Sequence, residues 1–113
     1  MWVQLTGLAA GVLVLASCSS SMSPGGGGGH STTITVSDNM FTPTPDTVNA
    51  GTVTFSWAGS NQHNVTWDSG PGTLPANSTT KTSGSYPATL QVGTYQYHCT
   101  IHGSVMSGTI VVH

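Results

Sequence analysis

The stretch that decides the fold is residues 93–102, which read GTYQYHCTIH. Its side chains alternate, because Tyr95, Tyr97 and Cys99 occupy every second position and polar residues lie between them. A period of two is typical of a β-strand with one buried face, since successive side chains of a strand point to opposite sides. We therefore predict a strand that carries Cys99 towards the core and turns His98 outwards.

The same alternation recurs in four other parts of the chain. The residues that share a parity are Ile34 and Val36; Val53, Phe55 and Trp57; His63, Val65 and Trp67; and Gly108, Ile110 and Val112. Stretches rich in Pro, Gly, Asn and Ser separate these runs, and no helical period competes with them. Several short strands joined by such turns indicate an all-β fold, and we predict a Greek-key β-sandwich over residues 32–113.

The predicted core follows from the same pattern. Trp57, Trp67, Tyr95 and Tyr97 are interpreted as core aromatics rather than as redox relays, and Met40 is also assigned to the core. In the third run His63 shares its parity with Val65 and Trp67, so its ring is expected to face inwards at the end of that strand.

The N-terminal residues predict export and anchoring. An apolar run over residues 5–16 is too short to span a bilayer comfortably, and it ends in small residues followed by Cys18, which resembles a bacterial lipobox. We predict a lipoprotein-type signal peptide over residues 1–17 and a lipidated Cys18 that begins a flexible Ser/Gly tether over residues 18–31. The alternative is a simple cleaved signal peptide with Cys18 unmodified. The lipid reading predicts a protein anchored to a bacterial membrane and facing the periplasm or the cell exterior.

The charge composition limits the classes of partner. Lys and Arg together number 1, Asp and Glu together 3, and the formal net charge is −2. A chain without a basic stripe is a poor match for nucleic acid, and so few charges give little long-range steering towards any partner. We expect a monomer with a polar but weakly charged surface.

Four side chains form a potential metal-donor set: His63 upstream, and Cys99, His102 and Met106 near the end of the chain. Two imidazoles, a thiolate and a thioether are the donors of a blue, type 1 copper centre. Taken singly, a buried Cys or a hydrogen-bonded His would be the simpler interpretation. The joint spacing favours a copper site, with core packing as the alternative role for Met106.

Larger segments carry a family resemblance. These segments are residues 41–43, 49–55, 63–65 and 93–102. Together they resemble the plastocyanin/azurin-like cupredoxins, over about residues 34–112. The resemblance implies a cupredoxin-like sandwich that binds one type 1 copper ion. It also implies a protein that carries single electrons between extracytoplasmic redox partners, such as cytochromes or oxidases.

The resemblance also assigns roles to individual residues. It implies that His63 and His102 are the imidazole ligands of the copper ion, that Cys99 is the thiolate ligand and that Met106 is the axial thioether. Asn64 matches the family's residue that helps to tie the two ligand loops together.

This chain departs from the family's pattern near the ligands. Three residues separate His102 from Met106, whereas plastocyanin-like loops commonly have four and amicyanin-like loops two. His98 stands where plastocyanins carry a Tyr that belongs to one electron route. The acidic patch that plastocyanins offer to cytochromes is absent from the sequence, so partner identity does not carry over.

Other functions remain as alternatives. A copper-binding protein that delivers the metal or maintains its homeostasis, without a redox shuttle, is the main one. A zinc-stabilised structural domain would also suit Cys and His donors. An enzyme would use Cys99 as nucleophile and Asn64 to orient a His base, but the inward parity of Cys99 argues against this. We therefore expect a protein that is not an enzyme.

Overall fold

The computed structural model describes residues 29–113, and the predicted signal peptide and Cys18 lie outside this part of the chain. The described part is all-β, with eight strands in chain order. They are β1 (Thr33–Ser37), β2 (Met40–Thr42), β3 (Asp46–Val48), β4 (Gly51–Trp57), β5 (Thr66–Ser69), β6 (Ser85–Leu90), β7 (Gly93–Cys99) and β8 (Gly103–Val112). Nowhere in residues 29–113 is there a helix with the length and apolar character needed to cross a bilayer.

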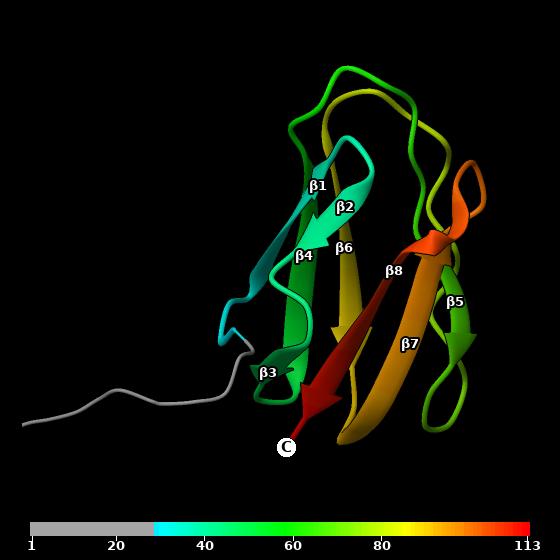
Figure 1. The fold of residues 1–113 in the computed structure, drawn as a ribbon. Helices are drawn as coiled ribbons and strands as arrows, with labels where there is room; N and C mark the ends of the chain where they lie inside the picture. Colours follow the sequence, from blue (N-terminus) through cyan, green and yellow to red (C-terminus); the bar gives the residue numbers. More distant parts are fainter. Residues whose placement is uncertain (1–28) are drawn as a thin grey trace, which may run out of the picture.

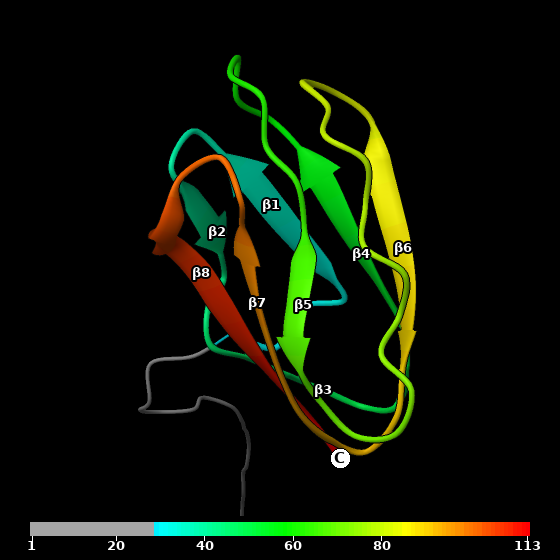
Figure 2. The same ribbon diagram turned by 90° about the vertical axis from the view of Figure 1, so that its right-hand side faces the viewer.

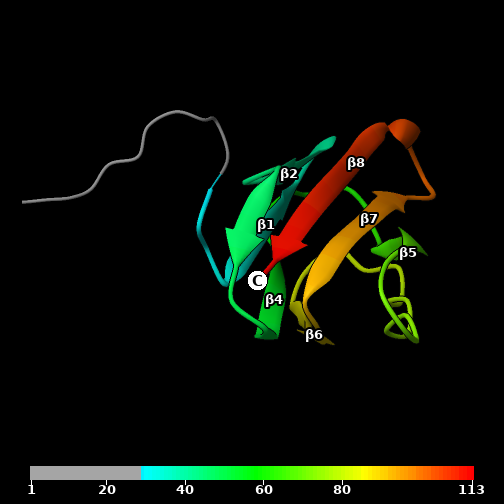
Figure 3. The ribbon, with the colours of Figure 1, turned by 90° about the horizontal axis from the view of Figure 1, so that it is seen from below.

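The strands form two four-stranded sheets, with orders β2-β1-β4-β6 and β3-β8-β7-β5 (Figure 1). Both sheets are mixed, since β1 is parallel to β4 and β3 is parallel to β8, whereas the other pairs are antiparallel. In Figure 2, β5, β7 and β8 lie in front of the other sheet, and seen from below the two sheets form separate layers (Figure 3). The chain changes sheet after each strand from β2 to β6. The prediction of an all-β sandwich is therefore confirmed.

The core between the sheets is built from the parities that the sequence indicated. Alternate residues of β4 and β7 are buried, including Phe55 and Tyr97, neither of which is exposed. The Tyr97 ring packs edge-on against Phe41 and Phe55, with centroid distances of 4.7 and 5.2 Å, and against Trp67 at 5.5 Å. Edge-to-face contacts of this kind are a favoured arrangement of aromatic rings. The four aromatic side chains predicted for the core, Trp57, Trp67, Tyr95 and Tyr97, are all buried.

Met40 is a correction, because the structure leaves it 55% exposed. It begins the short edge strand β2, whose antiparallel pairing with β1 turns the next residue, Phe41, into the core. Adjacent residues of a strand face opposite ways, so burying Phe41 exposes Met40.

Three strands, β2, β3 and β6, have no counterpart among the predicted runs. The first two contain only three residues each and flank a Pro-rich segment, so they are too short for alternation to be evident. β6 contains Pro87, which normally counts against a strand. The sheet order explains its presence, because β6 is an edge strand, where a residue without an N–H is tolerated.

Candidate metal centre

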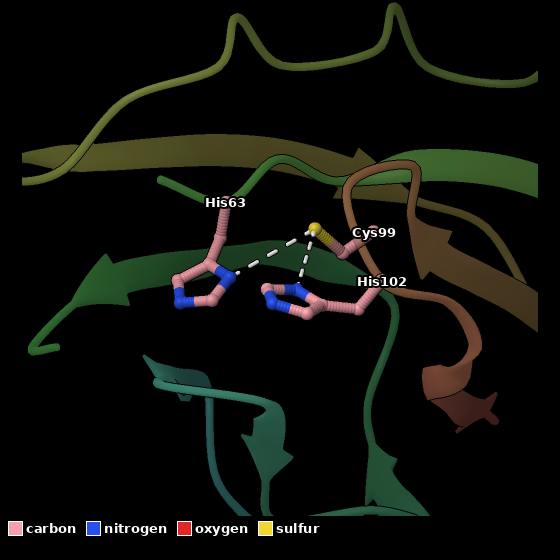
Figure 4. Close-up of side chains that lie close together, drawn as sticks. All are labelled: His63, Cys99 and His102. Carbon is pink, nitrogen blue, oxygen red and sulfur yellow. Dashed lines mark hydrogen bonds between the residues drawn. The ribbon is translucent and has the colours of Figure 1, made fainter. Parts of the chain in front are cut away.

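Three of the predicted donors converge at one end of the sandwich (Figure 4). The Cys99 Sγ lies 3.9 Å from Nδ1 of His63 and 3.9 Å from Nδ1 of His102. One potential ligand atom from each residue lies within 4.8 Å of the others. Cys99 and His63 are completely buried and His102 is half-buried, so the group has a closed side and a side nearer to solvent.

Two of these donors come from the tight connection between β7 and β8. Cys99 is the last residue of β7, and the N–H of His102 donates to the Cys99 carbonyl at 3.3 Å. The turn folds the His102 side chain back towards the sulfur (Figure 4). The pairing then skips residues 104–106, because His98 is opposite Ser107 but Cys99 is opposite Gly103. This irregularity separates the donor loop from the regular part of the sheet.

His63 comes from the connection between β4 and β5 and is held by its backbone. Its N–H and carbonyl exchange hydrogen bonds with Lys81, both at 3.0 Å, in an isolated bridge. The indole N–H of Trp57 also donates to the His63 carbonyl, at 3.1 Å. β5 begins only at Thr66, so His63 lies before the strand rather than at its end. These bonds nevertheless fix the backbone from which the inward-facing ring projects.

Asn64 joins the His63 segment to the β7–β8 loop. Its side-chain amide donates to the hydroxyls of Thr80 and Thr100, at 3.0 and 2.7 Å. Its carbonyl oxygen accepts from the backbone N–H of Thr100 and the hydroxyl of Thr66, both at 3.0 Å. Two of these four bonds reach the residue that directly follows Cys99. The distance between the two donor loops is therefore fixed by a buried, fully hydrogen-bonded amide.

Asp38 is a contact of the site that sequence reasoning missed. It lies in the turn between β1 and β2, and its Oδ1 is 3.1 Å from Nε2 of His63. The backbone N–H of Asn61, the His63 ring and the backbone N–H of Ser60 lower the pKa of Asp38 to about 2. Asp38 is 25 residues from His63 and on another loop. No local spacing in the sequence connects them.

The structure buries Met106 and turns His98 away from the core. Met106 is on β8, 1% exposed and part of the apolar core cluster. His98 points to the outer face of its sheet, where its Nδ1 is 2.8 Å from an Asp68 oxygen. This placement agrees with the alternation along β7, which turns His98 away from Cys99.

A two-sheet β-sandwich with a buried His-Cys-His group at one end defines a small metal-binding β-protein. This chain belongs to the cupredoxin-like domain family, because the model of that family matches residues 7–112. A comparison with curated proteins finds no match.

Solved structures agree with this assignment. A reduced Cu(I) form of an amicyanin mutant is 30% identical, with a TM-score of 0.59 over 72% of this chain and 80% of that one. Oxidised plastocyanin from Dryopteris crassirhizoma is 27% identical, with a TM-score of 0.57 over 72% of this chain and 99% of that one.

A Cu-containing nitrite reductase from Thermus scotoductus SA-01 shares the fold, at 24% identity and a TM-score of 0.60. The match covers 72% of this chain but only 22% of the reductase chain. The similarity therefore concerns one domain of a much longer protein.

Proposed function

We propose that this protein is a type 1 copper protein that carries single electrons between redox partners outside the cytoplasm. The observation that supports the proposal best is the convergence of His63, Cys99 and His102, with the two Nδ1 atoms each 3.9 Å from the sulfur. The similarity to copper-containing amicyanin supports it further.

The donors present suit copper. A buried Cys without a disulfide partner in residues 29–113 can act as a soft thiolate, and two imidazoles satisfy both Cu(I) and Cu(II). We propose His63, Cys99 and His102 as the principal ligands, with the buried Met106 as a weak axial fourth. Bound copper supplies one-electron redox chemistry at this site.

The chain contributes rigidity and access. The Lys81 bridge, the Trp57 indole and the Asn64 amide hold the donor loops in place, so the site resists rearrangement when its charge changes. A site that keeps one geometry in both oxidation states needs little reorganisation for electron transfer. His102 is the only half-buried member of the trio, and we assign it as the edge through which an electron enters and leaves.

Two exposed apolar side chains lie close to His102 in sequence. Ile101 is 51% exposed and Val105 is 80% exposed, and both flank the His102 turn in sequence. Weakly apolar contact without charge pairs suits short encounters that form and dissociate rapidly. We propose that redox proteins such as cytochromes or oxidases dock here, and that the lipid on Cys18 keeps the domain beside the membrane.

The burial of the donors supports a role as an electron carrier rather than as an enzyme. A cavity of about 460 Å³ is lined by Asp68, Gln96 and His98 on the outer face of the sheet, not by the three donors. His63 and Cys99 are completely buried, so a substrate has no approach to the sulfur in this arrangement. Electron transfer needs only the exposed edge of His102.

The test is a titration of the purified protein with Cu(II), followed by ascorbate and reoxidation in air. An intense visible thiolate-to-copper band that is bleached by ascorbate and restored by oxygen, with copper retained throughout, supports the carrier. Loss of copper on reduction would favour delivery of the metal. A colourless complex with Cu(II), with tight Zn(II) binding, would favour a structural zinc domain and overturn the proposal.

A further inference from the structure

The Asp38 carboxylate makes a close contact with one of the proposed copper ligands. His63 directs Nδ1 towards the Cys99 sulfur and Nε2 towards Asp38 Oδ1, at 3.1 Å. The two ring nitrogens therefore face different partners, a sulfur on one side and a carboxylate on the other. A hydrogen bond at the far nitrogen of a metal-binding His fixes the tautomer and orientation of its ring.

The carboxylate is itself held in a fixed position. Its oxygens accept the backbone N–H of Asn61 at 2.9 Å, and the N–H and hydroxyl of Ser60 at 3.1 and 3.2 Å. An ionised carboxylate only accepts hydrogen bonds, so the Asp38–His63 contact is a hydrogen bond when Nε2 of His63 carries the hydrogen. That tautomer leaves the Nδ1 lone pair free to bind a metal.

The backbone leaves room for the carboxylate at Gly59. A Cβ at this position would lie 2.2 Å from Asp38 Oδ1, well inside the distance at which atoms overlap. The segment 59–61 thus provides both the space and the amide donors for a carboxylate that comes from the opposite loop. An incidental surface contact would not require a glycine and three donors together.

The imidazole rings of His63 and His102 have different surroundings. Within the described residues, His102 makes a side-chain contact with the Cys99 sulfur but has no carboxylate partner of this kind. The buried ring is held by a negative charge, while the half-buried ring is left free at the surface. The negative charge thus contacts His63 and not His102, the proposed route of the electron.

We propose that Asp38 is a positioning residue for the metal centre, which fixes the His63 ring for ligation and biases the bound copper towards Cu(II). The inference rests on the proposed function. A carboxylate that accepts the Nε2 hydrogen makes the imidazole a stronger donor, and its charge favours the more positive oxidation state of the metal. The reduction potential is therefore lower than it would be with a neutral partner.

The main test is the reduction potential of Asp38→Asn, measured on the copper-loaded protein. The Asn side chain keeps an oxygen that can accept from Asn61 and His63, but removes the charge. Loss of an outer partner commonly weakens metal binding by about 10-fold to 100-fold. A 10-fold loss of affinity for Cu(II) relative to Cu(I) would raise a one-electron potential by about 59 mV.

The chain offers a matched control in Asp68→Asn. Asp68 pairs with His98 at 2.8 Å, so the substitution removes the same charge from the same kind of pair outside the donor trio. We expect its potential to change much less than that of Asp38→Asn. Equal shifts of the potential in the two variants would mean that net charge alone sets the potential, and would overturn the positioning role.

A second variant keeps the charge and disturbs its position. In Gly59→Ala the new methyl group would lie 2.2 Å from Asp38 Oδ1 and 2.7 Å from the Asp38 backbone nitrogen, so the carboxylate and its turn must shift relative to His63. We expect the potential to rise, though less than in Asp38→Asn, because the charge remains nearby. An unchanged potential in both variants would refute the inference.

A measurement without metal separates this inference from the copper assignment. The ¹⁵N shifts of the His63 ring in the metal-free protein report which nitrogen carries the hydrogen. We expect an Nε2–H tautomer in the wild-type protein and in Asp38→Asn, whose oxygen still accepts, and a mixture of tautomers in Asp38→Ala, which has no acceptor. If wild-type protein gives no thiolate-to-copper band, the proposed function and this inference both fail. A normal band, with an unchanged potential in Asp38→Asn and an unchanged tautomer in Asp38→Ala, defeats the inference alone.

Discussion

The two faces of β7 carry different chemistry on neighbouring residues. The inward face holds Tyr95, Tyr97 and Cys99, each at most 1% exposed, and it ends in the donor trio. The outward face holds Gln96 and His98, which line a surface cavity of about 460 Å³. A one-residue step along the strand thus separates a buried sulfur donor from a partly exposed imidazole. Strand parity, rather than nearness in sequence, therefore decides that Cys99 and not His98 belongs to the site.

The largest effect is expected from Cys99→Ser on the inward face. A serine hydroxyl is a much weaker copper ligand than a thiolate, because it stays protonated at neutral pH. We expect complete loss of the intense visible band and greatly weakened Cu(II) binding. Visible absorption and a competitive copper titration measure both, and circular dichroism of the metal-free variant checks that the sandwich still forms. A retained band would require another sulfur donor and would break the comparison.

The next largest effect is expected from Gly108→Ala, which changes the packing of the core against β7. Gly108 faces Tyr97 across the β7–β8 pair, and a Cβ there would lie 2.4 Å from the Cζ and Oη atoms of the ring. We expect Gly108→Ala to lower the free energy of unfolding by about 1–3 kcal/mol, since overpacking forces a fixed core side chain to move. Urea unfolding of the metal-free protein measures the change.

A double-mutant cycle tests that explanation for Gly108. Tyr97→Leu removes the ring atoms that the new methyl group meets, so the cost of Gly108→Ala should become smaller in that background. Thr94→Ala, at an exposed position of β7, serves as a control and should change stability by less than about 0.5 kcal/mol. An unchanged cost of Gly108→Ala in the Tyr97→Leu background would mean that the strain arises elsewhere.

A smaller effect is expected from Met106→Leu, which sharpens the distinction between ligand and core residue. Leu conserves volume, so the free energy of unfolding should fall by less than about 1.5 kcal/mol. If the thioether is the axial ligand, copper stays bound and the reduction potential rises, because an electron-donating group is lost. Voltammetry of the loaded variant decides between the roles. An unchanged potential would leave Met106 as a core residue only.

Strand parity explains why much of this molecule could be predicted from its sequence. β4, β7 and β8 are long strands with one buried face, and this burial is visible in the sequence as an alternation of side chains. β6 was missed because Pro87 interrupts it, and its edge position becomes clear only from the sheet order. Met40 was misplaced because its three-residue strand gives too few positions to establish a parity.

Part of the candidate site could also be predicted from the sequence. His63, Cys99 and His102 carry unusual side chains whose spacing is informative, and the structure brings their donor atoms together. Asp38 was not predictable, because it reaches His63 from the β1–β2 turn, 25 residues away in sequence. An Asp in a turn ordinarily caps amides of its own turn, whereas Asp38 accepts from the amides of Ser60 and Asn61 on another loop. These contacts depend on tertiary packing and leave no trace in local sequence.

The smallest effect is expected from His98→Ala, on the outward face next to Cys99. His98 and Asp68 form a partly exposed pair, with side chains 26% and 45% exposed. Such pairs contribute about 0–1 kcal/mol, because solvent screens them. We expect a fall in the free energy of unfolding within that range, and a thiolate-to-copper band of unchanged position and intensity. Visible absorption alongside Cys99→Ser makes the comparison direct. A bleached His98→Ala would mean that the outer imidazole supports the metal, and the separation of the two faces would fail.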